Sequence, residues 1–347
     1  MKYRHACVAM FVSSILSAAA FAQSSRVVTE EAMVKSPDPG IELYVRNKRA
    51  EGMASFSAER TLLFVHGATY PAETSFDLPI EGVSMMDLFA RNGFDVYLVD
   101  VRAYGRSTRP AEMYQPADAD KPIATSEDVG RDLGAAVDYI LKLRGISKLD
   151  LMGWSWGTSI AGNYASRHND KINRLVLYAP LWTFQPSVEA PTDPLPTYRQ
   201  VAKDEAKARW YKGVPQDKQG ALVPPGVFDQ WWEATLASDP IGSKMDPPVV
   251  RAANGVRAEI FNFWRAGKPL YDPGKITVPT LIIHAEWDAD LPSSMAQAYF
   301  AKLTAAPYKR FVELGEGTHT VMLEKNRMQF FHEILGFLSE TDPLALK

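Results

Sequence analysis

The chain has 347 residues, 46% of them hydrophobic, and a formal net charge of −3. That length can bury a large core, organised as one large domain with an insertion or as two modest domains. Because no basic face or run stands out, the composition argues against nucleic acid as a partner.

Residues 1–22 have the pattern of a signal peptide. A basic start and an apolar stretch over 6–20 precede Ala20-Phe21-Ala22, a small-x-small cleavage site that would make Gln23 the mature N-terminus. The alternative, a membrane anchor, is disfavoured because the stretch is short for a full span. The only cysteine, Cys7, would leave with the signal. We therefore expect a chain exported to a bacterial periplasm or secreted, without disulfides or a stable membrane anchor.

Beyond the signal, segments with strand and helix patterns alternate regularly. A leading antiparallel strand is expected at 41–49. Further strands are expected at 61–65, 94–99, 149–154, 174–178, 280–284 and 309–314, and helices at 85–92, 126–144, 158–167, 293–303 and 320–338. Ser126 is a candidate N-cap for the long helix. This alternation predicts an α/β fold with a mostly parallel central sheet and helices on both faces.

The alternation stops after the sixth strand. Five prolines lie between positions 180 and 196 and disfavour regular strands there. Three helical segments are expected next, near 197–211, 226–237 and 251–266. We therefore divide the mature chain into a core of residues 23–180 and 276–347 and a helical lid of residues 181–275. Such a lid would cover the carboxyl ends of the strands, where ligands bind in parallel sheets.

The sequence Gly153-Trp154-Ser155-Trp156-Gly157 lies between a predicted strand and a predicted helix. A G-x-S-x-G motif at such a junction is typical of a nucleophile elbow, in which a tight turn exposes the serine hydroxyl. The glycines are needed because a Cβ two residues from the serine would collide with neighbouring backbone. Ser155 is therefore the candidate nucleophile.

A serine nucleophile needs a base, and the base needs an acid that orients it. In this architecture the acid and then the histidine follow the serine, each in a loop after a late strand. His319 fits the base, since it follows the strand at 309–314 and a loop with two glycines. Glu286, Asp288 and Asp290 all lie in the loop after 280–284, although Asp290 also fits a cap for the helix near 293. The remaining candidates are worse placed: His66, His168, His284 and His332.

Attack on an acyl carbon creates an oxyanion, which backbone N–H groups stabilise. One donor is expected to be Trp156, directly after the nucleophile, and the other Ala68, after the strand at 61–65. The long loop of residues 69–79 lies next to this position, so Tyr70 or Asp77 could supply a polar contact to the substrate.

Five motifs together resemble lidded serine hydrolases of the α/β-hydrolase fold, similar to esterases and to monoacylglycerol-lipase-like and prolyl-iminopeptidase-like members. The motifs lie at 64–68, 100–107, 153–157, 286–288 and 317–324. The resemblance implies a triad of Ser155, Asp288 and His319 and an oxyanion hole of Trp156 and Ala68. It covers about 60–180 and 278–338 and says little about the lid.

At two places the sequence differs from particular groups of enzymes with this fold, which narrows the set of groups that it resembles. His66-Gly67-Ala68-Thr69-Tyr70 replaces the His-Gly-Gly-Pro-Gly loop of prolyl iminopeptidases, which weakens a peptidase assignment. Ser155 excludes the dehalogenases and epoxide hydrolases of this fold as close relatives, because they use aspartate at the elbow.

The lid is rich in aromatic residues and shows no cluster of arginines or lysines in sequence. Most of its aromatic side chains are expected to pack the lid onto the core. Candidate pocket residues are Tyr70, Trp154, Trp182, Trp231 and Trp232. We expect a small-molecule carboxylic ester with a mainly apolar or aromatic acyl or alcohol part, and neither metal nor organic cofactor. The alternatives are amide or peptide hydrolysis, lactone hydrolysis or perhydrolysis on the same triad, and a non-catalytic binding protein.

Overall fold

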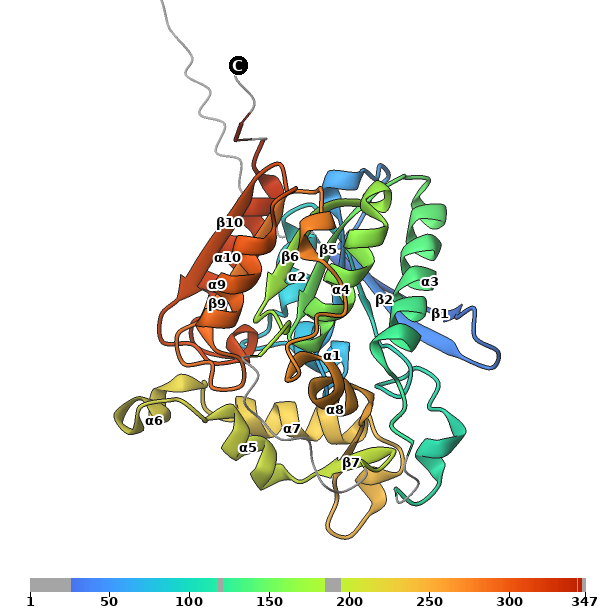
Figure 1. Ribbon diagram of the computed structural model, residues 1–347, viewed down its shortest axis with the longest axis vertical. Coiled ribbons are helices and arrows are strands. Elements are labelled where there is room, and N and C mark those ends of the chain that lie inside the picture. The colour runs from blue at the N-terminus through green and yellow to red at the C-terminus, as the bar shows by residue number, and fades with distance from the viewer. Residues whose placement is uncertain (1–25, 118–120, 185–194, 342, 345–347) are drawn as a thin grey trace, which may run out of the picture.

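The computed structural model describes residues 26–117, 121–184, 195–341 and 343–344. The predicted signal peptide lies outside these ranges. An eight-stranded sheet forms the centre, in the order β1-β2-β4-β3-β5-β6-β9-β10 (Figure 1). Its strands are β1 (Val27–Lys35), β2 (Glu42–Ala50), β3 (Thr61–Val65), β4 (Asp95–Val99), β5 (Leu149–Trp154), β6 (Ile172–Tyr178), β9 (Thr280–Ala285) and β10 (Lys309–Leu314).

Only β1 and β2 run antiparallel to their neighbours in this sheet. The pairs from β4 through β3, β5, β6 and β9 to β10 are parallel. The strands β3, β4 and β5 are buried along their whole length, as expected for strands covered on both faces. This arrangement confirms the predicted mostly parallel sheet.

Helices cover both faces of the sheet (Figure 1). They are α2 (Met85–Arg91), α3 (Ser126–Arg144), α4 (Trp156–Arg167), α9 (Ser293–Lys302) and α10 (Arg327–Ser339). The short helix α1 (Ala72–Phe76) lies instead at the carboxyl end of the strands, next to the insertion (Figure 1). Short 3-10 helices lie at Ala58–Arg60, Ala111–Tyr114, Asn169–Lys171, Pro273–Lys275 and Val321–Leu323. The helix predicted over 320–338 is thus a 3-10 turn followed by α10. Within the described ranges, no helix is both long and apolar enough to span a bilayer.

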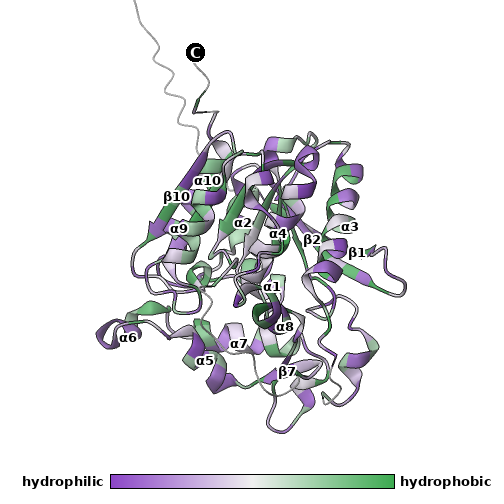
Figure 2. Cartoon of the chain, viewed as in Figure 1, coloured by the Kyte–Doolittle hydropathy of each residue, from purple (hydrophilic) through white to green (hydrophobic). Residues whose placement is uncertain are grey.

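Helix α3 shows how the sequence places a helix against the sheet. Its buried apolar residues include Val129, Leu133, Ala136, Val137 and Ile140, spaced to form one stripe. Figure 2 shows hydrophilic and hydrophobic residues distributed along this helix. The predicted cap was wrong by one residue. Thr125 is the N-cap and forms a capping box with Asp128, whereas Ser126 hydrogen-bonds to Glu259 of the insertion.

The residues between β6 and β9, called the insertion below, lie at the carboxyl end of the parallel strands (Figure 1). They include β7 (Tyr198–Val201), α5 (Lys203–Trp210), α6 (Gln219–Leu222), α7 (Val227–Ala237), β8 (Val250–Ala253), α8 (Gly255–Glu259), a π-helix (Ile260–Trp264) and 3-10 helices at Gln216–Lys218 and Gly242–Lys244.

The expectation of an all-helical insertion was therefore partly wrong. The ends of two predicted helices form instead an antiparallel pair, β7 with β8. Valines at Val201, Val249 and Val250 are buried in or beside this pair, where β-branched side chains pack well. Pairing between distant segments thus overrides the local helical pattern. Only the middle prediction, 226–237, coincides with one helix, α7.

Candidate active site

Ser155 lies in the turn between β5 and α4, with φ 55° and ψ −122°. A non-glycine residue in this strained conformation is typical of a functional site. The turn packs very tightly: a Cβ at Gly153 would lie 2.3 Å from the carbonyl oxygen of Gly157, and one at Gly157 would lie 2.5 Å from that of Val65. The two glycines therefore let the elbow form and press it against the end of β3.

A chain of hydrogen bonds connects Ser155 to His319 and Asp288. His319 Nε2 lies 2.8 Å from Ser155 Oγ, and His319 Nδ1 lies 2.7 Å from Asp288 Oδ2. The backbone N–H groups of Asp290 and Leu291 donate to Asp288 Oδ1 at 2.9 and 3.0 Å. The three residues predicted as a triad thus lie at hydrogen-bonding distance from one another, in the order that proton transfer requires. Both oxygens of the Asp288 carboxylate accept hydrogen bonds.

The surroundings of His319 tune its basicity. Burial lowers the pKa of this imidazole, but the charge and hydrogen bond of Asp288 and the charge of Asp290 outweigh burial, so the net pKa is raised above its usual value. The indole Nε1 of Trp154 donates to the His319 carbonyl at 2.8 Å, and the hydroxyl of Tyr178 donates to the Thr318 carbonyl at 2.5 Å. The loop that carries the imidazole is therefore anchored to β5 and β6.

The two rival acids have other partners. Glu286 accepts a hydrogen bond of 2.9 Å from the backbone N–H of Glu316. Asp290 forms an ion pair of 2.7 Å with Arg209 of the insertion. The predicted capping role of Asp290 was wrong, because Pro292 is the N-cap of α9 and no side chain caps that helix.

Two of the histidines that the sequence ranked lower, His66 and His284, are buried and make hydrogen bonds within the core. His66 is completely buried between the carbonyl of Gly67 and the N–H of Val101, which donates to His66 Nε2 at 3.2 Å. Burial lowers the pKa of His66, which favours the neutral ring that this bonding requires. His284 contacts the Leu291 carbonyl through Nε2 at 2.9 Å.

The predicted oxyanion donors are the residue that follows the nucleophile and a residue of the loop after β3. Trp156 is the first residue of α4, where backbone N–H groups are unpaired and the helix dipole is positive. A Cβ at Gly67 would lie 3.0 Å from the Ser155 Cβ, so the loop carrying Ala68 touches the serine. Among the described residues, neither the Trp156 nor the Ala68 backbone N–H donates a hydrogen bond. Both amides are available to an incoming oxyanion.

A small cavity of about 20 Å³ lies directly beside His319. The core contributes Ala68, Tyr70, Trp154, Asp290, His319 and Thr320 to its wall, and the insertion contributes Ala206, Arg209, Trp210 and Trp231. The rings of Tyr70 and Trp231 meet edge to face, with centroids 4.7 Å apart. The structure therefore brings three of the five predicted pocket aromatics together.

The other two predicted pocket aromatics do not line this cavity. Trp182 packs edge-on against Tyr299 of α9, with ring centroids 5.8 Å apart. Trp232 is buried in the insertion beside Trp231, and the centroids of the two rings lie 6.3 Å apart. Asp77 was also a wrong candidate for a substrate contact, because it forms ion pairs with Arg46 and Lys48 of β2.

Sequence reasoning missed two polar residues of this region, Arg199 and Arg209. It named Asp290 but did not predict the ion pair of Asp290 with Arg209. The two arginines lie on different elements of the insertion, β7 and α5, so nothing in the linear sequence groups them. A short spacing between basic residues is the usual signal of a charged site, and here the fold rather than the sequence provides the proximity.

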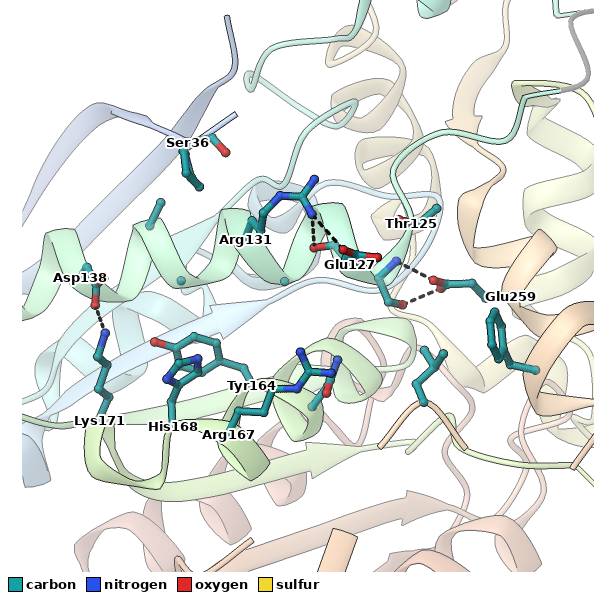
Figure 3. A pocket seen from close by; sticks show the side chains of 18 of the residues that line it. Ser36, Thr125, Glu127, Arg131, Asp138, Tyr164, Arg167, His168, Lys171 and Glu259 are labelled. Carbon is teal, nitrogen blue, oxygen red and sulfur yellow. Dashed lines mark hydrogen bonds and ion pairs between the residues drawn. The ribbon is translucent and has the colours of Figure 1, made fainter. Parts of the chain in front are cut away.

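A much larger cavity, of about 1170 Å³, lies elsewhere, between α3 and α4 (Figure 3). The residues that Figure 3 labels there include Arg131, His168 and Glu259, together with an ion pair of Lys171 with Asp138. Because its wall contains neither Ser155 nor His319, we place the candidate active site at the small cavity. In the described ranges, no three His, Cys, Asp or Glu side chains are grouped to hold a metal ion.

Comparison with known proteins gives a family match and several solved structures of similar fold. The model of a family described as "alpha/beta hydrolase fold" matches residues 60–326. Similar structures are an enol-lactonase from Burkholderia xenovorans (18% identity, TM-score 0.62), an esterase from Exiguobacterium antarcticum (17%, 0.57) and a bromoperoxidase from Bacillus anthracis (16%, 0.55). Each likeness covers 90% of this chain and 100% of the other. No curated protein matches.

Proposed function

Because the chain belongs to the alpha/beta hydrolase family, whose model matches residues 60–326, we propose that it is a serine hydrolase that cleaves carboxylic esters through an acyl-enzyme. The observation that carries this proposal is the continuous hydrogen-bond chain from Asp288 through His319 to Ser155. Nucleophile, base and orienting acid are all present in the geometry that acyl transfer requires.

In the proposed reaction, His319 Nε2 takes the proton of Ser155 as the serine Oγ bonds to the acyl carbon. The negative charge on the acyl oxygen is stabilised by the N–H groups of Trp156 and Ala68. The bond to the alcohol oxygen then breaks, and His319 returns the proton to the leaving alcohol. Water repeats the sequence on the acyl-enzyme and releases the acid and free Ser155.

We propose an ester with a mainly apolar or aromatic acyl or alcohol part. The support is the aromatic wall of the small cavity, where Tyr70, Trp154, Trp210 and Trp231 meet. A cavity of about 20 Å³ has room for little more than one water molecule. We therefore propose that the insertion acts as a lid, and that α5 and α7 move away from the core when substrate enters.

Labelling with a fluorophosphonate probe tests the proposed chemistry. The wild-type protein is expected to bind the probe covalently, and Ser155→Ala, with the same far-UV circular dichroism, is expected not to. Absence of both labelling and turnover would instead favour a non-catalytic binding protein. A panel of p-nitrophenyl esters, lactones, aminoacyl amides and a perhydrolysis assay then decides between ester hydrolysis and the alternatives on the same residues.

We also propose that the protein is exported after removal of residues 1–22, to a bacterial periplasm or to the medium. The support is the pattern of a basic start, an apolar stretch and a small-x-small site at Ala20-Phe21-Ala22. Intact-mass measurement of the protein from a bacterial host is expected to show Gln23 as the first residue. An uncleaved chain in the cytoplasm would contradict the export proposal.

A further inference from the structure

Two guanidinium groups of the insertion meet beside the predicted oxyanion hole. Arg199 of β7 donates from Nη2 to the hydroxyl of Thr69, and Arg209 Nη1 of α5 lies 3.5 Å from the same oxygen. Thr69 directly follows Ala68, is buried, and has a φ of 93°. The turn that positions the Ala68 amide is thus also the point at which both cations converge.

Among the residues that the structure describes, the charge of Arg199 has no carboxylate partner. Its remaining hydrogen bonds go to the Ala253 carbonyl at 3.0 Å and to Asn254 Oδ1 at 3.3 Å, so among the described residues all its acceptors are neutral. Burial lowers the pKa of Arg199, and the positive charges of Arg209 and Arg257 lower it further. A cation held away from water without a counter-ion is costly, and a bound anion would relieve that cost.

Arg209 is only partly neutralised. Its Nε pairs with Asp290 at 2.7 Å, which is the one ion pair that either Arg199 or Arg209 makes among the described residues. Among the described residues, the two guanidiniums therefore have one carboxylate as an ion-pair partner. Arg209 also lines the small cavity together with Ala68 and His319. The excess positive charge thus lies within reach of a molecule bound at Ser155.

We propose that Arg209, with Arg199 behind it, binds a carboxylate of the substrate, so that the preferred ester carries a negative charge near the bond that is cleaved. Because this role presupposes that Ser155 cleaves esters, it rests on the proposed function. It also refines the expectation of a mainly apolar or aromatic ester: the aromatic residues would contact the carbon chain, and Arg209 would contact the charged end. Guanidinium groups suit this task because they bind carboxylates through two parallel hydrogen bonds.

The competing explanation is structural. Arg199 could serve only to hold the Thr69 turn, in which case its loss would impair every substrate equally. Selectivity between a charged ester and a neutral ester of the same size separates the two explanations. The acyl pair is the p-nitrophenyl monoester of glutaric acid and p-nitrophenyl pentanoate. The alcohol pair is the butyrate ester of 4-hydroxybenzoate and that of its methyl ester.

The experiment compares wild type with Arg209→Gln, Arg199→Gln and Arg199→Lys. Wild type is expected to prefer the charged member of at least one pair. Arg209→Gln is expected to lose about tenfold or more of that preference, mainly through a higher KM for the charged ester. Arg199→Lys is expected to retain part of the preference, which guards against misfolding of Arg199→Gln. Glutarate is expected to inhibit wild type competitively and Arg209→Gln much more weakly.

Lys203→Gln is the matched control, because it removes one positive charge from the exposed start of the same helix, α5. Its selectivity is expected to equal that of wild type. Carboxylate recognition would be overturned if, in both pairs, wild type had a kcat/KM for the charged ester equal to or lower than that for the neutral ester. It would also be overturned if Arg209→Gln lowered the kcat/KM of the charged and the neutral ester equally. In both cases fluorophosphonate labelling would persist. If the probe did not label wild type, the proposed function itself would have failed.

Discussion

The indole Nε1 of Trp210 donates a hydrogen bond of 2.9 Å to Glu324 Oε1. Glu324 is completely buried, and it also accepts hydrogen bonds from the backbone N–H and the hydroxyl of Thr318, the residue before His319. One carboxyl thus joins α5 of the insertion to the loop that carries His319, the proposed catalytic base. Movement of the proposed lid and position of the imidazole are therefore mechanically connected.

Glu324 should make stability depend on pH. Burial raises its pKa from 4.5 to about 7, because burial penalises the ionised form more than its hydrogen bonds stabilise it. The folded state therefore keeps a proton that the unfolded state loses. The contribution to stability is complete below about pH 4.5 and is lost as the pH rises through about 7.

Glu324→Gln removes this titration. Between pH 5 and pH 8, the free energy of unfolding of wild type is expected to fall by about 1 to 2 kcal/mol more than that of the variant. Urea denaturation at both pH values measures the difference. The exposed Glu112→Gln is expected to follow wild type. Parallel pH profiles for wild type and Glu324→Gln would show that this carboxyl does not titrate in the range.

Asp290→Asn should shift the pH dependence of catalysis. The negative charge of Asp290 helps to raise the pKa of His319, and His319 must be unprotonated to act as the base. Removing that charge lowers the imidazole pKa, so the acid limb of kcat/KM is expected to move to lower pH. The measurement is the pH–rate profile of a neutral p-nitrophenyl ester, to avoid titration of the substrate.

Asp229→Asn is the control for this shift, because Asp229 lies in the insertion but pairs with Lys203 at the surface. Its acid limb is expected to coincide with that of wild type. A shift to higher pH in Asp290→Asn, or none, would show that Asp290 does not act on the base electrostatically.

Asp150 provides a second pH-dependent group, far from the chemistry. It is completely buried on β5. Its Oδ1 accepts a hydrogen bond of 2.8 Å from Asn173 Nδ2, while its Oδ2 has no hydrogen-bond partner among the described residues. Burial raises its pKa from 3.8 to about 8. Its contribution to stability is therefore complete below about pH 4 and lost as the pH rises through about 8.

Asp150→Asn keeps the size of the side chain and removes the charge. The variant is expected to match wild type within about 1 kcal/mol at pH 5 and to exceed it by about 2 kcal/mol at pH 9. Thermal or urea unfolding at both pH values tests this. Asp217→Asn, at an exposed position of the insertion, should leave the difference between the two pH values unchanged. A variant less stable than wild type at pH 9 would contradict the raised pKa of Asp150.

The core was largely predictable from sequence because its elements are determined by short-range patterns. The apolar run of β5, the two glycines around Ser155 and the amphipathic stripe of α3 are each visible within a few neighbouring residues. The convergence of Ser155 and His319 also followed, since the carboxyl ends of parallel strands meet at one edge of the sheet.

The insertion was less predictable because long-range contacts define it. Pairing of Tyr198 with Ala253 creates β7 and β8 where each segment alone favours a helix. The same pairing brings Arg199 to Thr69, and the docking of α5 brings Arg209 to Asp290. Neither contact has a signature in local spacing, so the charged wall of the cavity emerged only from the fold.

Gly157 offers the sharpest test of the elbow itself. A Cβ there would lie 2.5 Å from the Val65 carbonyl oxygen and 2.6 Å from that of His66. Both oxygens belong to backbone that cannot rotate away, so Gly157→Ala must push β3 and the Ala68 loop from the serine. We expect a loss of about 2 to 4 kcal/mol in the free energy of unfolding and a loss of activity that exceeds the loss of folded protein.

Gly130→Ala is the matched control. Gly130 lies within α3, and a Cβ there would meet no atom within 4 Å. Because alanine favours the helix over glycine, this variant is expected to gain about 0.5 to 1 kcal/mol of stability and to keep full activity. The contrast isolates steric contact from the general effect of adding a methyl group. If Gly157→Ala were as stable and as active as Gly130→Ala, close packing of the elbow against β3 would not be what positions Ser155.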